Sequence, residues 1–226
     1  VGGALSLEDA ARIICHRSRL MHRVSGRGAM AVVGLSLEET AAHLSGYETQ
    51  LSIAVSNSPR STVVSGEPEA LTALLAALEN DDVFCRRIKV DVASHSPQME
   101  PLQAELKTAL AGIRPQPAQI PIFSTVTGTV IDGEALTAAY WADNLRQPVL
   151  FTDTVQKAVE SDHLTFVEIS PHPILLTAIN ETLHHVAQAG LTVQSLKRDE
   201  PEQEQLLMGL GTLHAAGYQP DWGTLY

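Results

Sequence analysis

Apolar residues recur at intervals of three and four over the first part of the chain, which is the spacing of one face of an α-helix. Ser6 stands just before them, where a hydroxyl can cap the first turn, and Glu8 and Asp9 add negative charge there. The pattern predicts a helix that runs to about Arg23. Its apolar positions are Leu7, Ala10, Ala11, Ile14 and Cys15.

Residues 28–90 alternate between strand-like and helix-like patterns. Short apolar or β-branched runs indicate strands, and capped stretches with a helical period separate them. The resulting order, strand–helix–strand–strand–helix–strand, is typical of a ferredoxin-like arrangement, a four-stranded sheet covered on one face by two helices. In chain order the expected elements are 29–33, 36–44, 51–55, 61–65, 70–79 and 83–90.

Helices and strands continue to alternate after residue 90, so the fold class is α/β throughout. A Gly-Asp-containing stretch near residues 125–132 predicts a small hairpin, and a charged break at 197–201 precedes the last helix. The expected helices are 99–110, 155–160, 174–189 and 203–216, with a segment that opens at Tyr140-Trp141, and the expected strands are 120–124, 164–169 and 193–196.

Composition and charge exclude several classes of function. The 226 residues are 44% hydrophobic, which is enough for a buried core. A net charge of −11 argues against a nucleic-acid partner. No apolar run is long enough for a membrane span, and the first residues lack the basic flank of a signal peptide. Cys15 and Cys85 have no metal-ligand spacing, so we expect no metal, no disulfide and a cytoplasmic location.

His95 is the strongest candidate for a catalytic base. It follows a strand-like run and lies among small residues in Val92-Ala93-Ser94-His95-Ser96, which leaves an imidazole room to meet a substrate. An imidazole titrates near neutral pH and can take and return a proton within one cycle. A base of this kind needs a nucleophile beside it, yet residues 1–226 contain no Gly-x-Ser-x-Gly elbow.

Several motifs, taken in their order and spacing, resemble the acyltransferase domain of modular type I polyketide synthases, a relative of malonyl-CoA:acyl-carrier-protein transacylases. The resemblance covers essentially the whole chain. It rests on Gly3-Ala4-Leu5-Ser6-Leu7-Glu8-Asp9, Arg17-Ser18-Arg19, Gly28-Ala29-Met30, Asn57-Ser58-Pro59-Arg60, Val92-Ala93-Ser94-His95-Ser96-Pro97, Asn144-Leu145-Arg146 with Pro148-Val149, and Glu168-Ile169-Ser170-Pro171-His172-Pro173.

The resemblance implies an α/β-hydrolase-like large subdomain, present here without its N-terminal part, with an inserted ferredoxin-like βαββαβ subdomain. Residues 1–27 and 91–190 would form the large subdomain, residues 28–90 the small one, and residues 191–226 a linker that follows the acyltransferase. The family's nucleophilic serine lies in a Gly-His-Ser-x-Gly elbow, which we expect about nine residues before Val1. The isolated chain is therefore expected to be inactive.

The mechanism that the resemblance implies has two steps. The serine, deprotonated by His95, attacks an acyl-CoA extender, and the acyl-enzyme then passes its acyl group to the phosphopantetheine thiol of an acyl carrier protein. No metal or other cofactor is needed. The expected partners are the extender CoA, the carrier protein and adjacent synthase domains such as a ketosynthase, with no nucleic acid and no membrane. Candidate basic residues for the carrier are Arg86, Arg87, Lys89, Lys197 and Arg198.

Five further site residues come from the resemblance. Arg17 falls where the family places the arginine that grips the extender's free carboxylate, and Met30 is a further substrate-site candidate, although methionine more often fills a core. Asn144 matches the residue whose backbone carbonyl orients the catalytic histidine. Val92 and Ser94 occupy the specificity motif, in which serine before the histidine favours methylmalonyl over malonyl.

Two other functions remain open from the sequence. A serine acyl-hydrolase or editing enzyme would use the same dyad but release its product to water. A non-catalytic scaffold would lack the nucleophile altogether.

Overall fold

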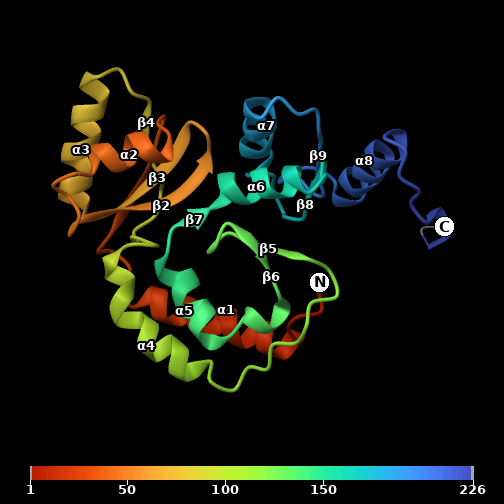
Figure 1. The fold of residues 1–226 in the computed structure, drawn as a ribbon, viewed down its shortest axis with the longest axis horizontal. Helices are drawn as coiled ribbons and strands as arrows, with labels where there is room; N and C mark the ends of the chain where they lie inside the picture. The colour runs from red at the N-terminus through yellow and green to blue at the C-terminus, as the bar shows by residue number, and fades with distance from the viewer. Residues whose placement is uncertain (1, 225–226) are drawn as a thin grey trace. The chain divides into compact units, whose positions relative to one another are not determined.

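The computed structural model describes residues 2–224, which form two compact units that meet between Lys157 and Ala158 in the chain. The first unit contains a five-stranded sheet and three helices that share a separate core (Figure 1). The second unit contains a two-stranded parallel sheet and two helices. No helix among the described residues has the length and apolar character needed to cross a membrane.

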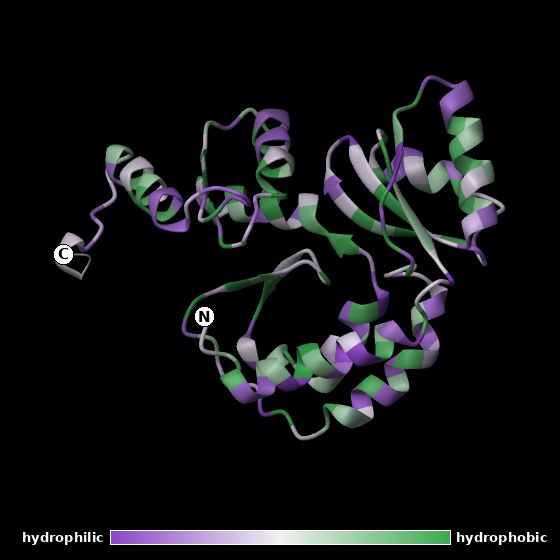
Figure 2. Cartoon of the chain, turned by 180° about the vertical axis from the view of Figure 1, so that it is seen from behind, coloured by the Kyte–Doolittle hydropathy of each residue, from purple (hydrophilic) through white to green (hydrophobic). Residues whose placement is uncertain are grey.

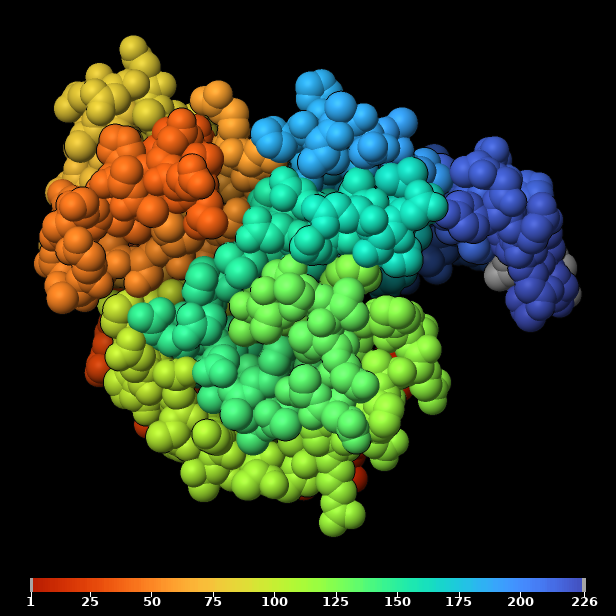
Figure 3. Space-filling model, viewed as in Figure 1, coloured from red at the N-terminus to blue at the C-terminus, as the bar shows by residue number. Residues whose placement is uncertain are grey.

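Four strands of the larger sheet confirm the predicted ferredoxin-like subdomain. Their spatial order is β4-β1-β3-β2, with every neighbouring pair antiparallel. Figure 3 shows residues 29–90, coloured orange to yellow, gathered in one lobe. The elements are β1 (Ala29–Val33), α2 (Leu37–His43), β2 (Leu51–Ser58), β3 (Ser61–Gly66), α3 (Pro68–Asn80) and β4 (Cys85–Arg87).

The two faces of this sheet are packed differently, because successive side chains of a strand point to opposite sides. Ala29, Ala31 and Val33 of β1 face a buried cluster that includes leucines of α3. Met30, between them, belongs to a second cluster with Ala54 and Val63 on the other face. Figure 2 shows green, hydrophobic stretches along the strands of this sheet, interrupted by paler and purple ones.

Three helices build the core beside the sheet: α1 (Leu7–His22), α4 (Glu100–Ala109) and α5 (Ala138–Arg146). The predicted first helix is confirmed, and the Ser6 hydroxyl accepts a hydrogen bond from the Asp9 backbone N–H at 3.0 Å. A short 3-10 turn, η1 (Pro97–Met99), leads into α4. The buried residues of this core are Ile13, Leu20, Met99, Leu102, Leu106, Leu110, Ile113 and Leu145.

The repeating apolar positions of α1 do not mark the face that this core buries. Ile13 and Leu20 are buried, whereas Leu7 is 86% exposed and Ile14 is 54% exposed. The helix therefore has apolar residues on two sides, and only one side is covered within the described residues.

The rest of the first unit connects the helical core back to the sheet. A hairpin pairs β5 (Ile122–Ser124) with β6 (Thr129–Ile131), as the sequence predicts. After η2 (Gly133–Ala135) and α5, strand β7 (Val149–Leu150) joins the edge of the larger sheet, parallel to β2. Helix α6 (Phe151–Glu160) follows directly.

The second unit is organised by β8 (Thr165–Glu168), which pairs in parallel with β9 (Leu191–Gln194). The predicted boundary at residue 190 lies between these two paired strands, and the division into compact units falls after Lys157. The Glu168 carboxylate accepts hydrogen bonds from the Ile174 and Leu175 backbone N–H groups, just before α7. The remaining elements are α7 (Leu176–His185), α8 (Glu202–Ala215) and η3 (Trp222–Thr224).

The strand predicted over residues 83–90 is shorter in the structure. It comprises only Cys85–Arg87, and one further backbone bond, from Ile88 N–H to the Met30 carbonyl, extends the pairing. The chain then turns away, since the Val90 N–H bonds to the Ile88 carbonyl at 2.9 Å. This early exit directs the chain toward His95.

Gly28 holds the segment before His95 against the start of β1. A side chain at Gly28 would place its Cβ 2.2 Å from the Ala93 backbone nitrogen, and the Gly28 N–H already bonds to the Asp91 carbonyl at 3.2 Å. Real Cβ atoms do not approach backbone this closely. The segment 91–93 can keep its position only if residue 28 is glycine.

We predict that Gly28→Ala destabilises the chain by about 2 kcal/mol or more, since the backbone around Ala93 must shift to admit the methyl group. Urea unfolding measures the change. Gly112→Ala is the matched control, because its Cβ would meet only the end of the flexible Arg12 side chain, at 3.0 Å. Equal stability of the two variants would contradict this reading.

Candidate active site

His95 lies at the end of the irregular segment that joins β4 to η1. Its backbone has φ of 61°, a left-handed conformation that is uncommon for a residue with a side chain. Ser96 supports this turn: its hydroxyl donates to the Ala93 carbonyl at 2.7 Å and accepts from the Gln98 N–H. Strained backbone of this kind persists where surrounding contacts hold it, and it is concentrated at functional sites.

The His95 ring is fixed by a hydrogen bond to a backbone carbonyl distant in sequence. Nδ1 lies 2.7 Å from the carbonyl oxygen of Gln147. A carbonyl can only accept, so Nδ1 carries a proton, and in the neutral ring Nε2 then has the lone pair. The residue as a whole is 9% exposed. This arrangement gives a buried imidazole that, in its neutral form, can accept a proton at Nε2.

The assignment of this orienting role to Asn144 is wrong. Asn144 lies inside the last turn of α5, which continues to Arg146. Gln147 is the first residue outside the helix, with φ of −71° and ψ of 153°, so its carbonyl is free to turn toward the histidine. The hydrogen bond to His95 therefore places the orienting carbonyl at Gln147.

A sequence signal for Gln147 exists in the proline that follows it. The residue before a proline is disfavoured in the helical conformation, because the proline ring crowds its backbone. Pro148 thus forces α5 to end and leaves the Gln147 carbonyl without an intrahelical partner. The Gln-Pro pair, rather than the asparagine one turn earlier, marks the orienting group.

Burial lowers the pKa of His95 below its ordinary value of 6.5. The Gln147 hydrogen bond opposes this shift, and the positive charges of Arg17 and Arg146 add to it. Because desolvation and the two cations both disfavour imidazolium, the ring is neutral near pH 7. A neutral ring is the form that a general base requires.

Arg17 lies on α1 with its charged group partly removed from water. Burial lowers the pKa of this guanidinium. Its Nε is buried and has no hydrogen-bond acceptor among residues 2–224. A buried donor without a partner is costly, so the group is suited to an anionic oxygen supplied from outside these residues. Its charge acts on His95, which places the two predicted residues in one electrostatic environment.

The other predicted residues are distributed around this pair. Ser94 is half-buried and adjoins His95. Val92 packs against the core of α1, α4 and α5, so its side chain also has a structural role. Met30 is 9% exposed and packs against Ala54 and Val63 on the sheet.

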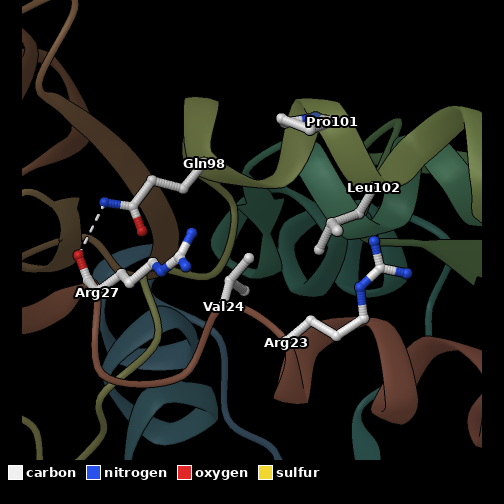
Figure 4. A pocket seen from close by; sticks show the side chains of 6 residues that line it. All are labelled: Arg23, Val24, Arg27, Gln98, Pro101 and Leu102. Atoms are coloured by element: carbon white, nitrogen blue, oxygen red, sulfur yellow. Dashed lines mark hydrogen bonds between the residues drawn. The ribbon is translucent and has the colours of Figure 1, made fainter.

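A hollow of about 580 Å³ lies on the α1 and α4 side of this region, between the end of α1 and the start of α4. Figure 4 shows Gln98 reaching across it, where Nε2 donates to the Arg27 carbonyl at 3.1 Å. This bond ties the turn after His95 to the connection between α1 and β1. The hollow is lined by Arg23, Val24, Arg27, Gln98, Pro101 and Leu102.

The candidate basic residues for a carrier protein belong to both units of the chain. Arg86, Arg87 and Lys89 are exposed in the first unit, at β4 and just after it. Lys197 and Arg198 lie in the second unit, where Lys197 is 3.4 Å from Glu200.

Comparison with known proteins identifies the family that this fold and site define. The model of the acyl transferase domain family matches residues 1–220, and the chain belongs to that family. The resemblance read from the motifs is confirmed, and with it the assignment to the transferases.

Polyketide synthases are among the relatives. The chain is 48% identical over 223 residues to the spectinabilin polyketide synthase system protein NorC of Streptomyces orinoci, covering 98% of this chain and 10% of that protein. It is 43% identical over 230 residues to erythronolide synthase EryA3 of Saccharopolyspora erythraea, covering 100% of this chain and 7% of that protein. The chain thus spans a small part of these long proteins.

Among solved structures, the acyltransferase domain from module 8 of the salinomycin polyketide synthase has a TM-score of 0.96 and 42% identity. The match covers 99% of this chain and 53% of that chain, so this chain spans about half of that solved domain. A malonyl CoA-acyl carrier protein transacylase from Clostridium perfringens, with a TM-score of 0.82 and 21% identity over 95% of this chain and 68% of that one, shares the fold.

We predict that His95 titrates below 6.5. We also predict that Arg17→Met raises the pKa of His95 toward the ordinary value, because one of the two cations that repel imidazolium is lost. NMR titration of the imidazole signals measures both. Arg19→Met is the control, since Arg19 is an exposed arginine on the same helix. An unchanged His95 titration in Arg17→Met would contradict the proposed proximity.

The lowered pKa also predicts the direction of a stability change. The folded chain binds the His95 proton more weakly than the unfolded chain does. The contribution of this group to the free energy of unfolding is therefore present above pH 6.5, and it is lost as the pH falls toward the lowered pKa.

Proposed function

We propose that this chain loads an extender unit, of the methylmalonyl type, from CoA onto the phosphopantetheine thiol of an acyl carrier protein in polyketide synthesis. The observation that carries the proposal is the 2.7 Å bond between His95 Nδ1 and the Gln147 carbonyl, beside a guanidinium whose Nε has no partner among the described residues. The charge of that guanidinium helps to lower the His95 pKa. One group serves as a base, and the other is suited to a carboxylate.

In the first step, His95 Nε2 takes the proton of the serine hydroxyl as the serine oxygen attacks the thioester carbonyl. The C–S bond breaks, CoA leaves as its thiol with that proton, and an acyl-serine ester remains. In the second step, Nε2 takes the proton of the carrier's thiol as its sulfur attacks the ester. The proton returns to the serine oxygen, which leaves. The serine is that of the family's elbow, a motif that residues 1–226 do not contain.

Arg17 supports a substrate that keeps a free carboxylate. Its guanidinium is a planar fork of donors and can hold both oxygens of a carboxylate. An acetyl group would leave this buried cation without its anion, and such a mismatch is penalised strongly in a partly desolvated site. Carboxylated extenders are therefore preferred over simple acyl groups.

Ser94 supports an extender with a branch at the α-carbon. A serine before His95 leaves space that a phenyl ring would fill. The acyl transferase domain of SpnD, a solved relative with 26% identity, is described as a complex with 2-(pent-4-yn-1-yl)malonyl. A substituted malonyl group is therefore compatible with this family's pocket, and we infer the same for this chain.

The function is tested in the synthase that contains this chain, with radiolabelled methylmalonyl-CoA and holo carrier protein. We predict that label transfers to the carrier faster than it is released to water. His95→Ala should lower acyl-enzyme formation by about 10²-fold or more, because general-base catalysis contributes factors of that order. Hydrolysis faster than transfer would favour an acyl-hydrolase, and normal loading by His95→Ala would remove the histidine from the mechanism.

The extender preference is tested by Ser94→Phe. We predict that the preference for methylmalonyl over malonyl falls by about 10-fold or more, because the phenyl ring takes the space of the α-methyl group. One methyl group in a pocket supports about 1 to 3 kcal/mol of discrimination, which corresponds to a change of this size. Competition between the two CoA esters measures the ratio. Val92 is left unchanged because its side chain packs against the core. An unchanged ratio would show that selectivity lies elsewhere.

A further inference from the structure

The two groups of the His95–Gln147 hydrogen bond lie at the ends of two helices. His95 stands one short turn before α4, which begins at Glu100. Gln147 is the residue that ends α5, and its own N–H bonds to the Asp143 carbonyl at 2.7 Å. Any movement of the start of α4 relative to the end of α5 changes the distance between the imidazole and its carbonyl.

An ion pair joins these same two helix ends. The Nε of Arg146, the last residue of α5, donates to Oε1 of Glu100, the first residue of α4, at 2.9 Å. The Arg146 side chain is 22% exposed, so most of it is packed in place. The Arg146 charge also acts on His95. The pair therefore joins α4 and α5 at the ends that lie nearest to the imidazole.

A second polar bond restrains the same helices one turn further on. Gln103 Nε2 of α4 donates to the Ala142 carbonyl of α5 at 2.9 Å. Beneath both bonds, Leu102 and Leu145 are buried in the shared helical core. The apolar core resists separation of the helices, but apolar contacts have little directional preference. The two polar bonds supply the direction, because they fix the sliding and rotation of α4 against α5.

We propose that the Arg146–Glu100 ion pair is a positioning device for the catalytic histidine: it holds the end of α5 against the start of α4 so that the Gln147 carbonyl keeps the proton on Nδ1 of His95. Arg146 and Glu100 act through Gln147 and His95, and the proposal gives them no contact with substrate. The inference rests on the proposed function only in that His95 is the base, since the geometry itself is independent of the substrate.

The chain contains a matched control for this device. Arg23, just after α1, holds Glu105 through both carboxylate oxygens, at 2.7 and 2.8 Å. Glu105 lies on α4, as Glu100 does, and the two side chains are similarly exposed, at 55% and 56%. The Arg23–Glu105 pair joins α4 to α1, however, and does not involve the helix that carries Gln147.

The test compares Glu100→Ala with Glu105→Ala in the full chain by ¹⁵N NMR of the imidazole at pH 8, where the ring is neutral. The ring ¹⁵N shifts report which nitrogen carries the proton. We expect the Nδ1–H form to dominate in the parent chain and in Glu105→Ala, and to fall below half in Glu100→Ala. If Glu100→Ala does not fold, Glu100→Gln provides the same comparison with a weakened bond.

An Nδ1–H population in Glu100→Ala that matches the parent would overturn the proposal. Equal losses in both variants would overturn it as well, since they would indicate a general loosening of α4. Failure of methylmalonyl transfer in the synthase would remove the proposed function but leave this tautomer result intact. In the active synthase, we expect Glu100→Ala to lower kcat by about 10-fold, and the rate to be less affected by Glu105→Ala.

Discussion

The hydrogen bond from His95 Nδ1 to the Gln147 carbonyl is the constraint on which the rest of the site depends. It decides which ring nitrogen can accept a proton, and it requires two segments far apart in sequence to meet within 2.7 Å. The fold supplies that meeting through α4 and α5, which share one apolar core. The left-handed backbone at His95 then aims the ring at the carbonyl.

The electrostatics of the site favour a base over an acid before substrate arrives. Burial and two guanidinium groups keep the imidazole neutral, and the Gln147 carbonyl only partly offsets them. Under the proposed function, an acyl group with a free carboxylate at Arg17 would neutralise one of these cations. The proton affinity of His95 would then rise when a carboxylated substrate is bound, so the base would be strongest with the substrate that the site selects.

Much of this arrangement is predictable from the sequence. The strand and helix periods of residues 29–90 specify the ferredoxin-like sheet, since alternation in β1 places Ala31 on one face and Met30 on the other. The Ser6 cap predicts where α1 begins. Local patterns are sufficient in these cases because strand alternation and a capping hydroxyl act within the element itself, whichever element later covers it.

Features that depend on distant contacts are less accessible to sequence reasoning. The apolar period of α1 includes Ile14, which is exposed, because periodicity shows which residues are apolar but not which element covers them. The orienting carbonyl belongs to Gln147, whereas the motif predicts Asn144. A backbone carbonyl leaves no signal in the identity of its own side chain, and only the following Pro148 indicates its role. Val92 reads as a specificity residue, yet it also packs in the core.

The most direct measurement is a crystal structure of the acyltransferase domain that contains this chain, with a stable methylmalonyl thioester analogue bound. We expect the free carboxylate on the Arg17 guanidinium, the reacting carbonyl on the Nε2 side of His95, and an intact Nδ1–Gln147 bond. A carboxylate held by another cation, or an imidazole turned so that Nδ1 faces the thioester, would contradict it.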